Sequence, residues 1–129
     1  MRYATFAVTL LLASLLVGCG GDSAEAVSKD MVANMKEMAS ILTGITDEAS
    51  AKAAVPRIEA VRAKMQECGR RAKEVPPIDA ATEQRIAKMF EKEMGEAMQS
   101  IFAAQQRLMA KPELLAIIAP AMENMEDDL

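Results

Sequence analysis

The chain has 129 residues, with 15 Lys and Arg against 19 Asp and Glu, a formal net charge of −4, no His and no Trp. This length suits one small domain. The absence of histidine removes the commonest general base and metal ligand, which excludes Ser-His-Asp hydrolases, zinc hydrolases and haem sites. The acidic balance argues against a nucleic-acid partner. We therefore expect no enzymatic activity, no cofactor and no nucleic acid.

Residues 1–18 have the layout of a secretory signal peptide. The positively charged Met1-Arg2 precedes an apolar run from Tyr3 to Val17, and the small residue Gly18 follows. The alternative is a transmembrane anchor, but the run has only 15 residues, and a helix needs roughly 20 to cross a bilayer. No cluster of Lys or Arg follows at residues 20–22 to stop transfer. The pattern therefore favours a removable signal.

The four residues Leu16-Val17-Gly18-Cys19 resemble the lipobox of bacterial lipoproteins. In that family the cysteine thiol is diacylglycerated, and signal peptidase II cuts just before it. The resemblance therefore implies cleavage between Gly18 and Cys19 and lipidation of Cys19. Residues 19–23 would then consist of the lipidated cysteine and a short tether. The alternative is an ordinary secreted protein in which Cys19 is incidental.

The same resemblance implies a location in the cell envelope, anchored to the lipid bilayer through acylated Cys19. The residue after the cysteine influences sorting in such proteins, and Gly20 in place of Asp favours the outer membrane, facing the periplasm. A tether of residues 20–23 has a reach of at most roughly 14 Å. We therefore expect the folded domain to lie close to the membrane surface.

The next part of the chain, residues 24–125, is predicted to be one helical domain. Good helix formers dominate it, and it has no alternating strand pattern and no hairpin dipeptide. The first helix is expected to begin near Asp22 or Ser23 and to end at Gly44 in the left-handed conformation. Its apolar seam, with 3-4 spacing, consists of Met31, Met35, Met38, Leu42 and Ile45.

The second helix is expected to begin with Thr46 as its N-cap and to end at Val75, before two prolines. Pro56 lies within it, on the outward face, and the apolar spacing keeps its phase across this residue. That phase indicates one kinked helix. The alternative is a short helix ending near Ala53 and a new one with Pro56 in its first turn. Met65 lies on its seam.

The third helix is predicted to begin after Asp79 and to run to about Ala110. Its apolar stripe is too wide for a two-stranded coil, so a third helix or a second copy of the protein must cover it. The residues that widen this stripe are Ile86, Met98, Phe102 and Met109. A fourth helix begins at Pro112, and Pro120 should bend or stop it. Residues 126–129 are expected to form a frayed acidic tail.

These elements predict an all-α fold, an elongated antiparallel helical hairpin or bundle of three to four helices. A short connection joins the second and third helices, which are therefore expected to be antiparallel neighbours. The first helix should pack along them, and the fourth should fold back over one end.

The chain contains 11 Met residues, and those after residue 18 lie on or near the predicted apolar stripes. Met31, Met35 and Met38 share one face of the first helix, and their thioethers are soft ligands that suit Cu(I). The alternative, which the spacing favours, is that Met fills an irregular apolar core. Converging sulfurs would support binding, and dispersed ones would support packing. Cys68 lies on the seam of the second helix and is expected to be a buried, inert thiol.

The overall pattern resembles uncharacterised small helical bacterial lipoproteins, with a lipobox, the segment Asp-Glu-Ala-Ser-Ala-Lys-Ala-Ala at residues 47–54, and a Met-rich helix. This resemblance implies no activity. The leading hypothesis is a membrane-tethered, non-catalytic structural or interaction module that binds another envelope protein or itself. The alternative is a periplasmic binder of soft metal, such as copper, or of a small apolar ligand.

Overall fold

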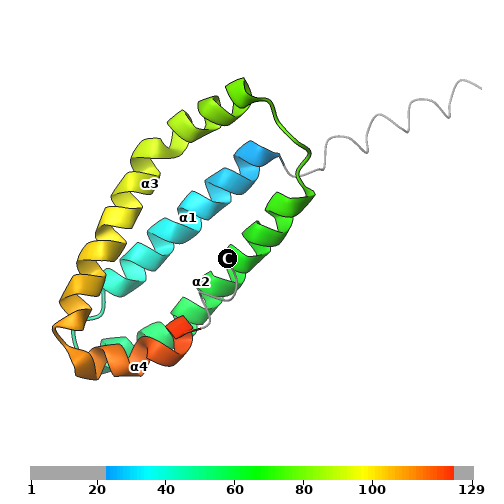
Figure 1. Ribbon diagram of the computed structural model, residues 1–129. Coiled ribbons are helices and arrows are strands. Elements are labelled where there is room, and N and C mark those ends of the chain that lie inside the picture. The colour runs from blue at the N-terminus through cyan, green and yellow to red at the C-terminus, as the bar shows by residue number, and fades with distance from the viewer. Residues whose placement is uncertain (1–22, 124–129) are drawn as a thin grey trace, which may run out of the picture.

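The computed structural model describes residues 23–123, which form four α-helices and no strand (Figure 1). The helices are α1 (Ala24–Thr43), α2 (Glu48–Glu74), α3 (Ala80–Met109) and α4 (Pro112–Met122). The predicted all-α bundle is thus confirmed. In this part of the chain, no helix is long and apolar enough to cross a membrane. The predicted signal peptide, Cys19 and its lipobox, the end of the predicted domain at 124–125 and the tail at 126–129 lie outside the described residues.

Side chains that accept backbone N–H groups start three of the helices. Ser23 caps α1, and Asp79 caps α3 as predicted. The N-cap of α2 is Asp47, so the prediction of Thr46 was wrong by one residue. Asp47 Oδ1 accepts from the Ser50 N–H at 2.8 Å, while Ser50 Oγ accepts from the Asp47 N–H at 3.0 Å. This reciprocal pair satisfies two backbone donors that a helix start leaves without partners.

Gly44 ends α1 without the left-handed conformation that the sequence predicted. Its φ is −74°, in the right-handed region, and its N–H donates to the carbonyls of Ser40 and Ile41. Arg107 of α3 supplies the missing cap, because its Nη2 donates to the carbonyls of Leu42, Thr43 and Ile45 at 2.9–3.2 Å. A distant cation therefore satisfies the carbonyl end of α1, where the helix dipole also favours positive charge.

The two internal prolines have different positions in their helices. α2 continues through Pro56, which is exposed, so the single helix and the outward face predicted for this residue are confirmed. Pro120 lies near the end of α4, which ends two residues later at Met122. The stop predicted there agrees with this boundary, because a proline N removes a hydrogen-bond donor from the last turn.

The prediction that the second and third helices are direct neighbours was wrong. α1 lies between α2 and α3 and packs along both, running parallel to α3 and antiparallel to α2 (Figure 1). The connection at 75–79 has five residues, which reach up to roughly 17 Å and can pass over a helix about 10 Å wide. α4 packs mainly against α2 and touches α3. As the central helix, α1 buries a broader set than its predicted seam, adding Val27, Val32, Asn34, Ala39 and Ile41.

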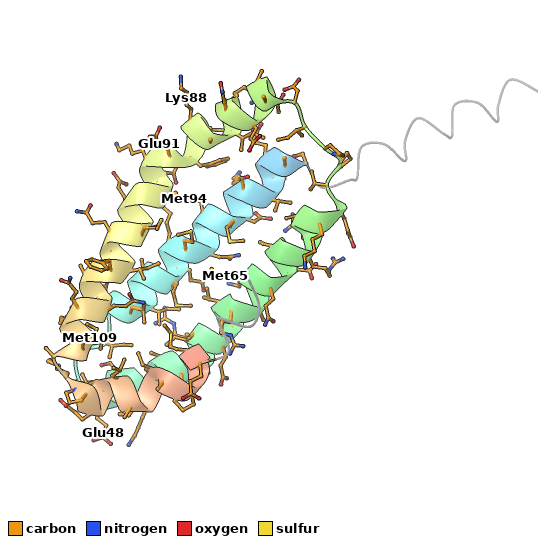
Figure 2. All side chains as sticks on the ribbon, viewed as in Figure 1. Glu48, Met65, Lys88, Glu91, Met94 and Met109 are labelled. Atoms are coloured by element: carbon orange, nitrogen blue, oxygen red, sulfur yellow. The ribbon has the colours of Figure 1, made fainter. Side chains whose placement is uncertain are left out.

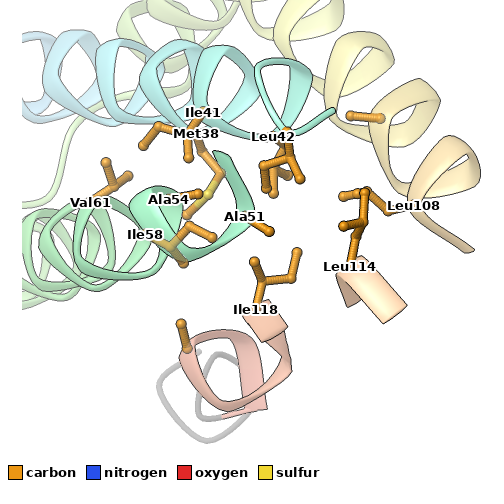
Figure 3. Close-up of a cluster of buried hydrophobic side chains, with 13 residues drawn as sticks. Met38, Ile41, Leu42, Ala51, Ala54, Ile58, Val61, Leu108, Leu114 and Ile118 are labelled. Atoms are coloured by element: carbon orange, nitrogen blue, oxygen red, sulfur yellow. The ribbon is translucent and has the colours of Figure 1, made fainter. Parts of the chain in front are cut away.

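The main core lies where α4 closes one end of the three long helices. Ile41 and Leu42 from α1 meet Ile58 from α2, Leu108 from α3 and Ile118 from α4, and each is at most 2 % exposed (Figure 3). Met65, predicted as a core position, is only partly buried at the edge of this cluster. The far ends of the long helices carry fewer buried side chains. The apolar contacts that hold the bundle together are therefore concentrated at the α4 end.

Asp47 should make stability depend on pH at the start of α2. The hydrogen bond from the Ser50 backbone N–H holds the pKa of Asp47 below its ordinary value of 3.8. A lowered folded-state pKa means that this stabilisation is present above the unfolded pKa and is lost as pH falls through the folded one. We expect Asp47→Ala to lower the urea midpoint near pH 6, and the difference from wild type to shrink as the pH drops below 3.8.

Asp47→Asn is the matched control for this prediction, because asparagine caps a helix without titrating. It should retain more of the wild-type midpoint near pH 6 than Asp47→Ala does. The urea midpoint of all three proteins is measured from the helical circular dichroism signal during urea titration. A gap between wild type and Asp47→Ala that stays constant from about pH 6 to pH 2 would contradict the account.

Candidate binding groove

Exposed apolar side chains gather on one flank of α3 and the adjoining part of α4. Met98, Phe102 and Met109 are 57 %, 62 % and 66 % exposed, and Leu115 is 38 % exposed. Residues 98, 102, 105 and 109 share a helix face because they are spaced by four, three and four residues. Four of the six large hydrophobic side chains exposed in the described residues thus lie together, and clustering of this kind marks interaction sites.

Beside this flank lies a cavity of about 320 Å³, here called the Met cavity. All four described helices contribute to it, and five of its lining residues are methionines. They are Met35 and Met38 from α1, Met65 from α2, Met98 from α3 and Met122 from α4. Leu42, Ile101, Phe102 and Gln105 complete the lining, which therefore contains no charged residue. Figure 2 shows Met65 and Met94 projecting from α2 and α3 toward α1.

Two further cavities adjoin the Met cavity along the same flank of α3. One, of about 490 Å³, shares Leu42, Gln105 and Met122 with it and reaches Leu115 and Glu123 of the α4 end. The other, of about 680 Å³, shares Met98 and extends toward the start of α3. We call the three cavities together the groove. The polar residues that line its open end, toward the start of α3, are Ser28, Gln84, Lys88 and Glu91.

Four ion pairs that join α1 to its neighbours lie outside the groove. Those to α3 are Glu25–Arg85 and Lys36–Glu93, and those to α2 are Asp30–Arg71 and Glu37–Lys64. None of these eight residues lines any of the three cavities. The described part of the bundle thus has an apolar face with the groove and charged edges where α1 meets its neighbours. Exposed pairs of this kind contribute little stability.

Cys68 lies in α2, away from the groove. It is 2 % exposed, and the Asn34 side-chain Nδ2 donates to its Sγ at 3.4 Å. Burial raises the pKa of the Cys68 thiol, with opposing effects from Arg71 and Asn34. The predicted burial is confirmed. A neutral, covered thiol is a poor nucleophile, so this residue provides no reactive group.

The structure divides the methionine set named from the sequence. Met35 and Met38 line the Met cavity, whereas Met31 lines none of the described cavities. Met65, Met98 and Met122 join them. The sequence pattern placed Met65 on the seam of the second helix and Met98 among the residues that widen the stripe of the third. The feature of the sequence that pointed to a surface site here was the width of the apolar stripe on α3. Its outer residues Met98, Phe102 and Met109 are exposed in the structure. Gly18 and Cys19, the predicted cleavage and lipidation residues, lie outside the described part of the chain.

Among residues 23–123, no group of three His, Cys, Asp or Glu side chains comes together as a metal site would require. Comparison with protein-family models, with curated proteins and with solved structures found no match to this chain. The groove is thus the feature of the described bundle from which function can be argued.

Proposed function

We propose that the protein is a lipid-anchored, non-catalytic binding module of the bacterial cell envelope, held at the outer membrane through Cys19. It binds another component of the envelope in the groove. The anchor is inferred from the lipobox residues Leu16 to Cys19. The observation that carries the binding role is the gathering of Met98, Phe102, Met109 and Leu115 at the groove. Leaving these side chains in water is costly, and a bound partner would remove that cost.

The chemistry of the groove supports binding rather than catalysis. Its central part offers thioethers, aliphatic groups, one phenyl ring and the amide of Gln105, and none of these is an acid, a base or an activated nucleophile. Methionine side chains are flexible and polarizable, so a Met-lined surface can adapt to its occupant. These properties suit recognition of an apolar shape.

Photo-cross-linking in living cells tests the binding role. The photoreactive amino acid p-benzoyl-phenylalanine is placed at position 102, in the groove, or at position 89, an exposed Met position of α3 outside it. We expect a defined adduct from position 102 and little or none from position 89, read by electrophoresis and mass spectrometry. Equal yields at the two positions, or no adduct at either, would overturn the proposal.

Soft-metal binding is a second candidate, favoured by the five thioethers that line one cavity. Thioether sulfur suits Cu(I), and convergence of the methionines was the feature expected of a binding site. Met38→Leu removes a sulfur while keeping an apolar side chain, and Met31→Leu is the control outside the cavity. Cu(I) titration against a competing chelator should show weaker binding for Met38→Leu alone. Equal competition by wild type and Met38→Leu rejects this candidate.

A further inference from the structure

The size of the cavities restricts what can enter the groove. Two turns of helix, about 10 Å wide and 11 Å long, occupy roughly 850 Å³. The three cavities of the groove are about 320, 490 and 680 Å³, so none of them encloses a helix of this size. All three lie within the range of small-molecule sites, about 300–1,000 Å³. The dimensions therefore favour a slender hydrocarbon chain over a protein helix.

The distribution of polar groups along the groove indicates an amphiphile. The Met cavity has Gln105 as its one polar lining residue. At the end near the start of α3, by contrast, Ser28, Gln84, Lys88 and Glu91 line the larger cavity (Figure 2 labels Lys88 and Glu91). Lys88 and Glu91 make no ion pair with any described residue. A polar headgroup can therefore meet one cation and one anion there while an apolar tail lies among the methionines.

The part of the groove between Lys88 and Met98 is as long as one acyl chain. A bilayer core about 30 Å thick is spanned by two acyl chains end to end, so one chain extends roughly 15 Å. This equals the rise of about ten helical residues at 1.5 Å each. A headgroup beside Lys88 thus places the end of its chain near Met98 and Phe102, in the Met cavity.

We propose that the groove binds the single acyl chain of a zwitterionic lysophospholipid, with the headgroup beside Lys88 and Glu91, the chain along the larger cavity and its end in the Met cavity. Lys88 pairs with the phosphate, and Glu91 pairs with the ammonium group. Opposite charges on one headgroup complement the two unlike charges at this end of the groove. The inference rests on the proposed binding role of the groove and names the chemical class of its ligand.

Native mass spectrometry tests this proposal with the full chain carrying Cys19→Ala, so that no covalently attached acyl chain competes. The probe is lysophosphatidylethanolamine with one palmitoyl chain, and we expect a one-to-one adduct. Met98→Gln should weaken binding about tenfold, because it removes apolar contact with the chain. Met89→Gln, an exposed methionine of the same helix outside the groove, should change the affinity less than about twofold.

The headgroup contact is tested by a separate variant and its matched control. Lys88→Gln should weaken binding of the same probe severalfold, whereas Lys92→Gln, outside the three cavities, should not. No adduct, or equal affinity in wild type and Met98→Gln, overturns the proposal. Palmitate binding as tightly as the probe also overturns it, because the headgroup would then contribute nothing. If position 102 cross-links to a protein and the probe does not bind, the ligand class is wrong and the binding role stands.

Discussion

Cys19→Ala is expected to block lipid attachment to the protein. A thiol is required at this position for diacylglycerol attachment in the lipoprotein family that the lipobox resembles. One acyl chain gives only marginal membrane binding, whereas two or more anchor a protein stably, since each buried CH₂ contributes about 0.8 kcal/mol. Wild type should enter the detergent phase of a membrane extract. The variant should remain as an uncleaved precursor or appear as a differently processed soluble form.

Cys68→Ala is the matched control, because Cys68 is the other cysteine of the chain and is buried in α2. It should leave both processing and fractionation unchanged. Mass spectrometry of the exported protein gives the N-terminal residue and its mass. An unmodified Cys19 on correctly exported protein would contradict the lipoprotein assignment and, with it, the location at a membrane surface.

The largest loss of folding stability is expected from the core at the α4 end. Ile58 is fully buried there among residues of α1, α2 and α4, and it lines none of the three groove cavities. Ile58→Ala should cost about 2–5 kcal/mol of unfolding free energy, from lost apolar burial and the cavity left behind. Urea titration followed by circular dichroism measures this change.

Glu59→Ala, at the next position of the same helix, is the control for Ile58→Ala. Glu59 is exposed, so its replacement should change the unfolding free energy by no more than about 0.5 kcal/mol. Since Ile58 lies outside the groove, the probe should still bind Ile58→Ala under conditions where that variant is folded. Similar urea midpoints for the Ile58 and Glu59 variants would contradict the burial assigned to α2.

Local features of the bundle were predictable because they depend on neighbouring residues. Asp79 caps α3 and Pro112 begins α4 as expected, α2 continues through Pro56, and the helices end within a residue or two of their predicted bounds. The order of the helices in space was not predictable from connection length alone. In the structure, α1 lies in the centre and buries residues on several sides, including Val32 and Ala39. The narrow methionine seam predicted from the sequence does not include these two residues.

The groove was only partly predictable for a related reason. The sequence shows that the stripe on α3 is wide, but it does not show which helix covers which part. α1 covers one side of the stripe, with Ala97, Ala104 and Leu108 buried, and leaves Met98 and Phe102 exposed. Met65 and Met122 reach the same cavity because α2 packs against α1 and α4 packs against α2. Such convergence depends on tertiary packing.

The central claim is that the groove is occupied in the cell envelope, and methionine oxidation tests it most directly. Dilute peroxide converts accessible Met to its sulfoxide. The oxidation of each Met is measured by peptide mass spectrometry, once after treatment of intact cells and once after treatment of protein refolded from urea. Unfolding in urea removes any non-covalently bound occupant. Met98 and Met109 lie in the groove, and exposed Met89 lies outside it. We predict that oxidation of Met98 and Met109, relative to Met89, is severalfold slower in cells than in the refolded protein. An equal ratio in cells and in refolded protein would contradict the claim.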